Sequence, residues 1–384
     1  MQARIMSFRR ALMILGAVVT AGITLSCGGG GLNTSAGGSN GPDAGRPGVV
    51  YTMSNGSGGN AVLAFNRNAD GTLQAAGIFP TGGTGTSSGL ENQGALAVSE
   101  DGRFLLVVNP ASDDFTIFRI TSTGLEVTSR MASGGKRPVS ITSRGTLIYV
   151  LNAGSRVGES DNVTGFRLVA DGTVAALSGS TRPLSSAAAD PVQVQLSPNA
   201  DLLVVTERGT NVLTSYTLDA NGIPAVAHAN PSAGIAPFGF TFSGSTRLFV
   251  SEAGTNSASS YAVQPDGSVR TISAAIPTSQ RAVCWLAVTP DGRFAYTANT
   301  GSGSITGFRI ASDGSLQILN PDGLTADTSG GPLDMAPSPD GQWLYALTNG
   351  QSIEVFRIDS TSGSLTKAQT VTGLPAGSNG LVAD

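Results

Sequence analysis

The chain has 384 residues, of which 52 are Gly and only 12% are charged, and its formal net charge is −4. Charged residues usually make up about a quarter of a globular chain, so this composition favours a turn-rich, all-β protein. It argues against a nucleic-acid partner, because phosphate contacts need clustered Lys and Arg and no basic run follows the N-terminal segment.

The first 27 residues are typical of a bacterial export signal. Three Arg residues precede an apolar stretch over 11–25, which has the length of a signal core and is short for a membrane-spanning helix. The stretch ends in Thr-Leu-Ser-Cys, which resembles a lipobox with Thr24 in place of the usual aliphatic residue. We therefore predict lipidation at Cys27, with a plain signal peptide cleaved nearby as the alternative. Both interpretations predict a periplasmic or cell-surface protein, lipid-anchored in the first case.

Residues 28–48 are too polar and Gly-rich to fold alone, and we interpret them as a flexible tether. The folded domain is expected over 49–384. The second cysteine, Cys284, has no partner within the chain if Cys27 is lipidated, so no disulfide framework is expected. Its apolar surroundings favour a buried small side chain over a nucleophile.

A four-strand unit repeats through this domain and is clearest at 284–319. Strands are predicted at 284–288, 294–299, 304–310 and 315–319, where apolar residues either run together or alternate with polar ones. Asp-Gly pairs at 291–292 and 313–314 suit tight hairpins. Such a small sheet cannot bury both faces alone, so repeated sheets would pack face to face around an axis. The pattern predicts a seven-bladed β-propeller of four-stranded antiparallel blades.

Two residue types mark every repeat. A polar residue ends each second strand: Asn55, Asn109, Asn152, Glu207, Glu252, Asn299 and Asn349. An aromatic residue follows each: Phe65, Phe118, Phe166, Tyr216, Tyr261, Phe308 and Phe356. We interpret the aromatics as packing between sheets, and the Asn residues mainly as turn residues.

The chain ends predict how the ring closes. The first repeat lacks an inner strand, whereas residues 380–384 follow a complete last repeat and match the inner strands of the others. The C-terminal segment is therefore expected to supply the missing strand, which removes an exposed sheet edge.

These repeats resemble the seven-bladed lactonase family, which includes bacterial 6-phosphogluconolactonase and the fungal carboxymuconate-lactonizing enzyme. The resemblance rests on the outer Asp-Gly-Ser-Leu-type hairpins and on hairpins at 100–103, 289–293 and 338–341. It covers residues 48–384 and implies the propeller fold and activity on a lactone.

One motif departs from the family. Enzymatic members carry a His-Pro-His-Gln stretch, and here the matching residues are Asp190, Pro191, Val192 and Gln193. Both histidines are missing, while the acid in the turn that follows persists as Glu207. The family's histidine chemistry is therefore not available to this chain.

Several site types can be set aside. The single histidine, His228, is expected on an outer strand or loop, so neither a Ser-His-Asp triad nor a His/Cys zinc set can form. Glycine runs such as 301–303 lack the Lys and the strand-to-helix context of a phosphate loop. We expect no metal and no cofactor.

Candidate site residues come from loops that enter inner strands or leave second strands, because these loops should share one face of the ring. Lactone opening needs a general acid or base and cations that hold an anion or oxyanion. Glu207 or Glu252 could be the acid–base, with Arg137 and Arg281 as the anion clamp. The candidate substrate-binding residues are Gln193, Asp190, Arg208, Asn109 and Asn152. The same charged residues could also form purely structural ion pairs.

The sequence thus leads to two functional hypotheses. The first is an exported, monomeric, lactonase-like propeller that hydrolyses a sugar lactone or related cyclic ester. The alternative is a non-catalytic cell-envelope propeller that binds a ligand or a protein. The missing histidines, the presence of a tether and the low charge favour this alternative. In both, the membrane is reached only through the lipid anchor.

Overall fold

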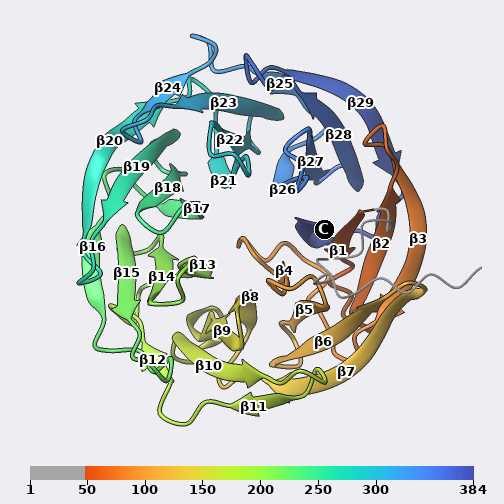
Figure 1. Cartoon of the computed structure of the whole chain (residues 1–384), viewed down its shortest axis with the longest axis vertical. Coiled ribbons are helices and arrows are strands. Elements are labelled where there is room, and N and C mark those ends of the chain that lie inside the picture. The colour runs from red at the N-terminus through yellow and green to blue at the C-terminus, as the bar shows by residue number, and fades with distance from the viewer. Residues whose placement is uncertain (1–47) are drawn as a thin grey trace, which may run out of the picture. The chain divides into compact units, whose positions relative to one another are not determined.

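Residues 48–384 are described by a computed structural model, and the predicted signal, Cys27 and tether up to residue 47 lie outside them. They form seven antiparallel sheets arranged as a ring (Figure 1). Five sheets have four strands and two have five, because the outer strand of those two is split into short pieces. The seven-bladed propeller predicted from the repeats is confirmed. Blades are numbered here in chain order, and blade 1 contains β1.

The strands fall into four concentric sets. The inner strands of blades 1 to 7 are β30 (Asn379–Ala383), β4 (Leu96–Val98), β8 (Pro138–Arg144), β13 (Pro191–Leu196), β17 (Pro237–Ser243), β21 (Val283–Val288) and β26 (Pro332–Pro337). The second strands are β1 (Val49–Met53), β5 (Phe104–Asn109), β9 (Leu147–Asn152), β14 (Leu202–Glu207), β18 (Arg247–Glu252), β22 (Phe294–Asn299) and β27 (Trp343–Thr348). The third strands are β2 (Ala61–Arg67), β6 (Asp114–Thr121), β10 (Asn162–Leu168), β15 (Val212–Thr217), β19 (Ser257–Val263), β23 (Ser304–Ile310) and β28 (Ser352–Ile358). The outer strands are β3 (Leu73–Pro80), β7 (Gly124–Ala132), β11 (Val174–Ala176) with β12 (Arg182–Pro183), β16 (His228–Pro231), β20 (Val269–Pro277), β24 (Leu316–Ile318) with β25 (Ala326–Asp327), and β29 (Leu365–Thr372).

The hairpins between inner and second strands show why the Asp-Gly pairs recur. In blade 6 the Thr289 hydroxyl donates to the Asp291 carboxylate over 2.6 Å, and the backbone N–H of Arg293 donates to the same oxygen over 3.1 Å. Gly292 between them has φ +69°, a conformation that costs a residue with a Cβ but not glycine. Side chain and backbone together therefore fix the turn and the register of the strands.

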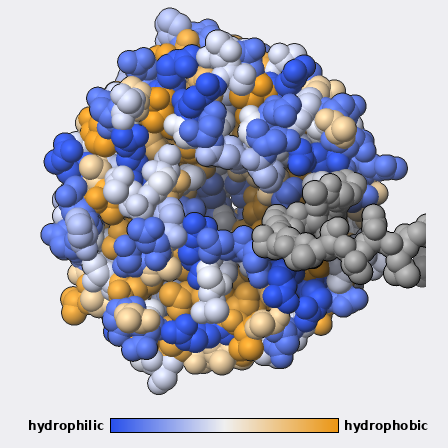
Figure 2. Space-filling model, viewed as in Figure 1, coloured by the Kyte–Doolittle hydropathy of each residue, from blue (hydrophilic) through white to orange (hydrophobic). Residues whose placement is uncertain are grey.

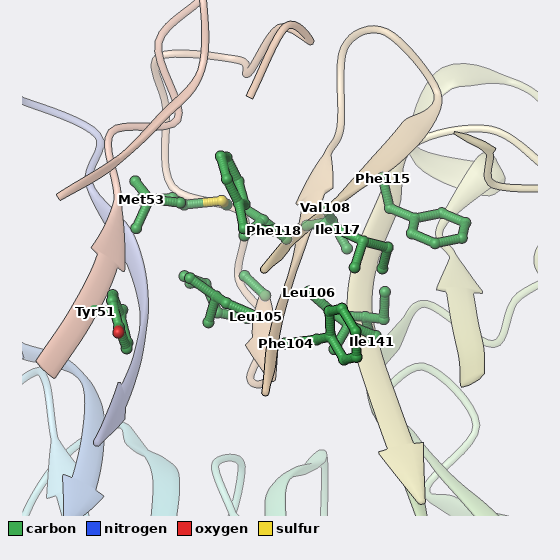
Figure 3. Close-up of a cluster of buried hydrophobic side chains, with 14 of the residues drawn as sticks. Tyr51, Met53, Phe104, Leu105, Leu106, Val108, Phe115, Ile117, Phe118 and Ile141 are labelled. Carbon is green, nitrogen blue, oxygen red and sulfur yellow. The ribbon is translucent and has the colours of Figure 1, made fainter. Parts of the chain in front are cut away.

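Apolar side chains fill the spaces between neighbouring blades. Figure 3 shows one such cluster, in which Phe104 and Leu105 from β5 and Phe115 and Phe118 from β6 are buried. Phe115 meets Phe166 of the next blade edge to face, with ring centroids 4.9 Å apart. The seven repeated aromatics are all buried, which confirms that they pack between sheets.

The C-terminal strand closes the ring. β30 pairs antiparallel with β1, so that Val50 lies opposite Ala383 and Tyr51 opposite Val382. The predicted closure is confirmed. On its other side β30 meets β26 of blade 7, where the buried Asp334 carboxylate accepts the backbone N–H of Leu381 over 3.1 Å. Blade 1 thus joins the two ends of the described chain.

Helical structure is scarce in residues 48–384. The 3-10 helix η1 (Gly154–Val157) lies in the loop between β9 and β10. Over the same residues, no helix is both long and apolar enough to cross a bilayer.

Candidate functional site

Loops that enter inner strands lie beside loops that leave second strands, as predicted. The backbone N–H of Ala153 donates to the Arg137 carbonyl over 3.0 Å, and the N–H of Gly209 donates to the Ala189 carbonyl over 3.0 Å. Equivalent bonds link these loops in other blades. We call the side of the ring on which these loops lie the mouth face.

In blades 2 to 7 a comparable position lies at the approach to the inner strand on the mouth face. In blades 2, 3 and 4 it is Glu91, Arg137 and Asp190, with φ of 52°, 54° and 44°. In blades 5 and 6 it is Ala236 and Ala282, with φ of 55° and 52°. Blade 7 has Gly331 there. We call blades 2–4 the charged half of the mouth and blades 5–7 the small half, because this position carries charged residues in one and small residues in the other.

Four charged side chains join into one network in the charged half. Asp190 accepts from the Nε atoms of both Arg156, over 2.9 Å, and Arg208. Arg208 also donates to the Glu91 carboxylate over 2.5 Å. Arg156 comes from η1 and donates further to the carbonyls of Leu90 and Pro191. We call these side chains (Arg156, Asp190, Arg208 and Glu91) the Arg156 network, which carries two positive and two negative charges.

The network determines the charge of its members. Burial raises the pKa of Asp190, but hydrogen bonds and charges from Arg208 and Arg156 outweigh burial and leave that pKa below its usual range. Burial would lower the pKa of Arg208, but its bonds to Asp190 and Glu91 raise it. Asp190 is therefore ionised at neutral pH and is a poor proton acceptor. Glu91 is the most exposed member of the network, with 61% of its side chain accessible to solvent.

The segment 90–93 lies inside the mouth, and we call it the strap. The side-chain amide of Gln93 donates to the Leu286 carbonyl of blade 6 over 2.7 Å, and the Leu286 N–H returns a bond over 3.1 Å. The Trp285 indole donates to the Asn92 carbonyl over 2.7 Å. Figure 1 shows the connection between β3 and β4 running into the centre of the ring, and Figure 2 shows a central hollow bordered largely by hydrophilic residues. Because Arg156 also donates to the Leu90 carbonyl, the strap links blade 6 to the Arg156 network.

Glu207, a predicted acid–base, lies inside blade 4 and is fully buried. Its carboxylate accepts from the Ser185 N–H over 3.0 Å and from the hydroxyls of Thr210 and Thr214 over 2.7 and 2.5 Å. The Ser185 hydroxyl donates to it as well. With both oxygens engaged, this group holds two loops and the third strand to β14.

Glu252 occupies the equivalent place in blade 5. It is fully buried and accepts from the hydroxyls of Ser232, over 2.9 Å, and Tyr261, over 3.1 Å. Burial raises its pKa. The structure does not bring Glu207 and Glu252 together with the Arg156 network.

The predicted clamp residues lie on different parts of the mouth face. Arg137 is half-buried in blade 3, and its backbone N–H donates to Asp113 over 2.8 Å. Arg281 is exposed in blade 6, where its guanidinium reaches the Gly301 carbonyl at 3.5 Å. Neither guanidinium has a carboxylate partner among residues 48–384. Both could therefore receive an anion.

The other predicted binding residues make internal contacts. Gln193 spans two inner strands, since its side-chain amide exchanges bonds of 2.9 and 2.7 Å with the backbone of Phe240. Asn109 donates to Asp114 over 2.7 Å, and Asn152 donates to Asn162 over 2.9 Å. Asp190 and Arg208 are the two members of this set that belong to the Arg156 network.

Arg156 is not among the site residues predicted from the sequence. A signal was present, because Phe166 follows Asn152 by fourteen residues, the widest spacing of the repeated pair. The extra length is the loop that carries η1 and Arg156, whereas the corresponding loop of blade 4 has four residues, 208–211. An insertion in one repeat marks the loop that differs in role, but it does not say which of its side chains points inward.

The remaining reactive side chains offer little chemistry. His228 is exposed on β16, as predicted for an outer strand. Burial raises the pKa of Cys284 to about 12, so its thiol stays protonated at neutral pH. Across residues 48–384, no three His, Cys, Asp or Glu side chains gather as a ligand set for a metal ion.

Comparisons with known proteins agree with the propeller fold. The family model "Lactonase, 7-bladed beta-propeller" matches residues 48–182, 159–286 and 267–379. No curated protein matches the sequence significantly. The periplasmic gluconolactonase PpgL of Pseudomonas aeruginosa is similar in structure, with a TM-score of 0.68, 19% identity, and coverage of 88% of this chain and 98% of that one.

Two further solved structures are comparable. A provisionally assigned 6-phosphogluconolactonase of Bacteroides uniformis has a TM-score of 0.69 and 19% identity, covering 87% of this chain and 99% of its own. A Lactobacillus plantarum protein has a TM-score of 0.70 and 16% identity, covering 88% and 99%. At these identities the likeness concerns the fold. From the family match over nearly all of residues 48–379, the chain belongs to the seven-bladed β-propeller lactonase family.

Proposed function

We propose that the chain hydrolyses a sugar lactone or a related cyclic ester on the mouth face, beside the Arg156 network. Family membership supports the reaction class, and the names of solved relatives, among them a periplasmic gluconolactonase, support the substrate class. The observation that carries the proposal is the exposed Glu91 carboxylate, held in place by Arg208. A base fixed beside guanidinium groups is what ester opening requires.

In this proposal Glu91 takes a proton from a water molecule as the water oxygen attacks the lactone carbonyl carbon. The carbonyl oxygen becomes an oxyanion, which Arg208 and Arg137 stabilise by charge and hydrogen bonding. The ring C–O bond then breaks, and the leaving oxygen takes the proton back from Glu91. The product is the open hydroxy acid. Asp190 and Arg156 act as positioning residues, because they hold Arg208 and the strap rather than the lactone.

The assay would follow proton release from glucono-1,5-lactone and muconolactone by residues 28–384, which include the whole closed ring. We expect Glu91→Gln to lower kcat/KM by about 100-fold or more, the usual contribution of a general base. Glu207→Gln tests the original prediction that Glu207 is the base. If Glu91 is the base, Glu207→Gln should keep turnover in the fraction that folds.

Asp291→Asn is the matched control, since Asp291 pairs with Arg293 in a hairpin between β21 and β22, away from the mouth face. Its turnover should equal that of the unmodified chain. Full activity in Glu91→Gln would overturn the assignment of the base. No turnover above the spontaneous rate on either lactone would instead favour the second candidate function.

That second candidate is a non-catalytic propeller that binds its ligand on the mouth face. Asp190 and Val192 stand where enzymatic members have histidines, and Val192 is fully buried against Phe238 and Trp285. A buried valine cannot move a proton. Under this function, Arg208→Ala would weaken binding of a lactone or its hydroxy acid without any turnover to lose.

We further propose that the protein is a monomer exported to the cell envelope and anchored through Cys27. The N-terminal sequence supports export and lipidation, and β30 pairs with β1 within the same chain, so closing the ring needs no second copy. Fractionation of cells that produce the wild type or Cys27→Ser tests the anchor. Release of Cys27→Ser from the membrane fraction is expected, and equal retention of both would contradict it.

A further inference from the structure

Six of the seven interfaces between blades are filled in the same way. The hairpin between the third and outer strands of one blade places a glycine against the first residue of the second strand of the preceding blade. A Cβ on any of these glycines would lie within 3.3 Å of that neighbour. The glycine–neighbour pairs are Gly71–Trp343, Gly172–Phe104, Gly222–Leu147, Gly267–Leu202, Gly314–Arg247 and Gly363–Phe294.

The interface between blades 1 and 2 differs. Its turn, between β6 and β7, has two residues, Ser122 and Thr123, whereas the corresponding hairpins of blades 1, 3, 5, 6 and 7 have five or six. Gly124 has φ +138°, outside the 75–89° of the six filling glycines. A Cβ on Gly124 would meet the Phe79 ring at 2.6 Å, not the first residue of β1. The short turn leaves this interface unfilled.

At two repeated positions blade 1 has a smaller side chain than most other blades, which enlarges the unfilled space. The first residue of β1 is Val49, where the other second strands begin with Trp, Phe, Leu or Arg. Asn66 follows the repeated aromatic of β2, where four other blades have Arg. In blades 2, 3 and 6 that Arg donates to a carbonyl of the next hairpin, for example from Arg119 to Asp171 over 2.5 Å. Three separate changes therefore coincide at one interface.

The result is a pocket of about 290 Å³ between blades 1 and 2. Apolar walls come from Val49, Tyr51, Phe79 and Leu125, and a polar rim comes from Asn66 and residues 121–123. No charged side chain of the described chain lines it. The Asn66 amide and the Ser122 hydroxyl have no hydrogen-bond partner within residues 48–384, so both can bond to a ligand. The hairpins between third and outer strands lie at the strand ends opposite the loops of the mouth face. The pocket therefore lies on the side of the ring opposite the mouth face.

We propose that this pocket binds one uncharged pyranose ring. The volume suits a single six-membered ring with its substituents. An aromatic wall suits the apolar C–H face of a sugar, while an amide and hydroxyls on one rim suit its hydroxyl groups. An uncharged lining selects against anionic sugars, because a charged group would be desolvated without a partner. The proposal does not depend on activity at the mouth.

The probes are methyl α-D-glucopyranoside, its galacto and manno isomers, and phenol, added to residues 28–384 and followed by saturation-transfer NMR and titration. A ligand of this size is expected to bind with a dissociation constant of about 1 mM. Val49→Phe restores a residue used in blades 2 and 6 and should fill the pocket. It should weaken binding at least about tenfold, as should Asn66→Ala, which removes the amide.

Thr217→Ala is the matched control, because Thr217 follows Tyr216 in blade 4 as Asn66 follows Phe65, and the hairpin of blade 5 fills that interface. It should bind like the unmodified chain. If Val49→Phe does not fold, Ala64→Leu fills the same pocket from β2. Absence of binding at a glycoside concentration of about 50 mM, 50 times the expected dissociation constant, would overturn the proposal. So would phenol binding without glycoside binding, or binding unchanged by Val49→Phe.

Discussion

Asp190 at the approach to β13 in the charged half of the mouth and Asp334 on β26 in the small half both belong to inner-strand segments, yet their surroundings give them opposite properties. Asp190 sits between two guanidinium groups, and its pKa is lowered. Asp334 on β26 is buried with only the N–H groups of Met335 and Leu381 as donors, and burial raises its pKa to about 8. The partners of each acid therefore decide whether it carries a charge at neutral pH.

The largest expected effect concerns Asp334. Between its unfolded pKa of 3.8 and its folded pKa of about 8, the folded chain holds a proton that the unfolded chain has released. The free energy of unfolding should therefore fall by up to about 1.4 kcal/mol per pH unit as pH rises through this window. Denaturant titrations from pH 4 to pH 8 measure this slope. Asp334→Asn should remove this contribution from the slope, and a slope equal to that of the wild type would contradict the assignment.

Asp190 should act in the opposite direction and in another window. Because its folded pKa lies below 3.8, its stabilising contribution is present above that value and is lost as pH falls through the folded pKa. Asp190→Asn should therefore leave the slope between pH 5 and pH 8 as in the wild type. The pH dependence of the free energy of unfolding of the two variants therefore distinguishes the acid of the small half from that of the charged half.

The next effect tests the Arg156 network. Arg156→Ala leaves Asp190 and the Leu90, Glu91 and Pro191 carbonyls without a shared donor, so the free energy of unfolding should fall by about 3 kcal/mol. Urea unfolding measures this loss. The control is Arg281→Ala in the small half, an exposed side chain that should change stability by less than about 0.5 kcal/mol. Equal losses in both would mean that the network adds no stability.

The smallest effect tests the backbone of the small half. Ala282 has φ +52° and no side-chain group that could compensate for the strain of this conformation. Ala282→Gly should therefore raise the free energy of unfolding by about 0.5 kcal/mol, since glycine adopts this conformation freely. Asp190→Gly should lower it, because there the side chain bonds to two guanidinium groups. A destabilised Ala282→Gly would show that its methyl group packs.

Much of the fold was predictable because the same pattern of strands and turns occurs seven times in the sequence. The strands predicted at 294–299 and 304–310 are β22 and β23, and the C-terminal segment closes the ring as expected. Alternating apolar residues and Asp-Gly turns are local signals, and each copy reinforces the others.

The candidate site was less predictable because it depends on single residues that break the repeat. Glu207 and Arg208 are neighbours in sequence, yet one is buried inside a blade and the other joins the Arg156 network. Strand alternation indicates opposite sides, but it does not say which side faces the mouth. The strap crosses the ring to a strand 193 residues away, a contact without any local signal.

Because β30 pairs with β1, blade 1 can be completed only after the other six blades have been synthesised. β1 leaves the ribosome before the other six blades, whereas β30, the inner strand of the same blade, is made after them. Until residues 379–383 emerge, β1 keeps an unpaired edge and the other blades form an open arc, a state prone to wrong pairing. Closure of the ring must therefore follow the synthesis of all seven blades. A chain truncated after residue 378 would leave the arc unclosed.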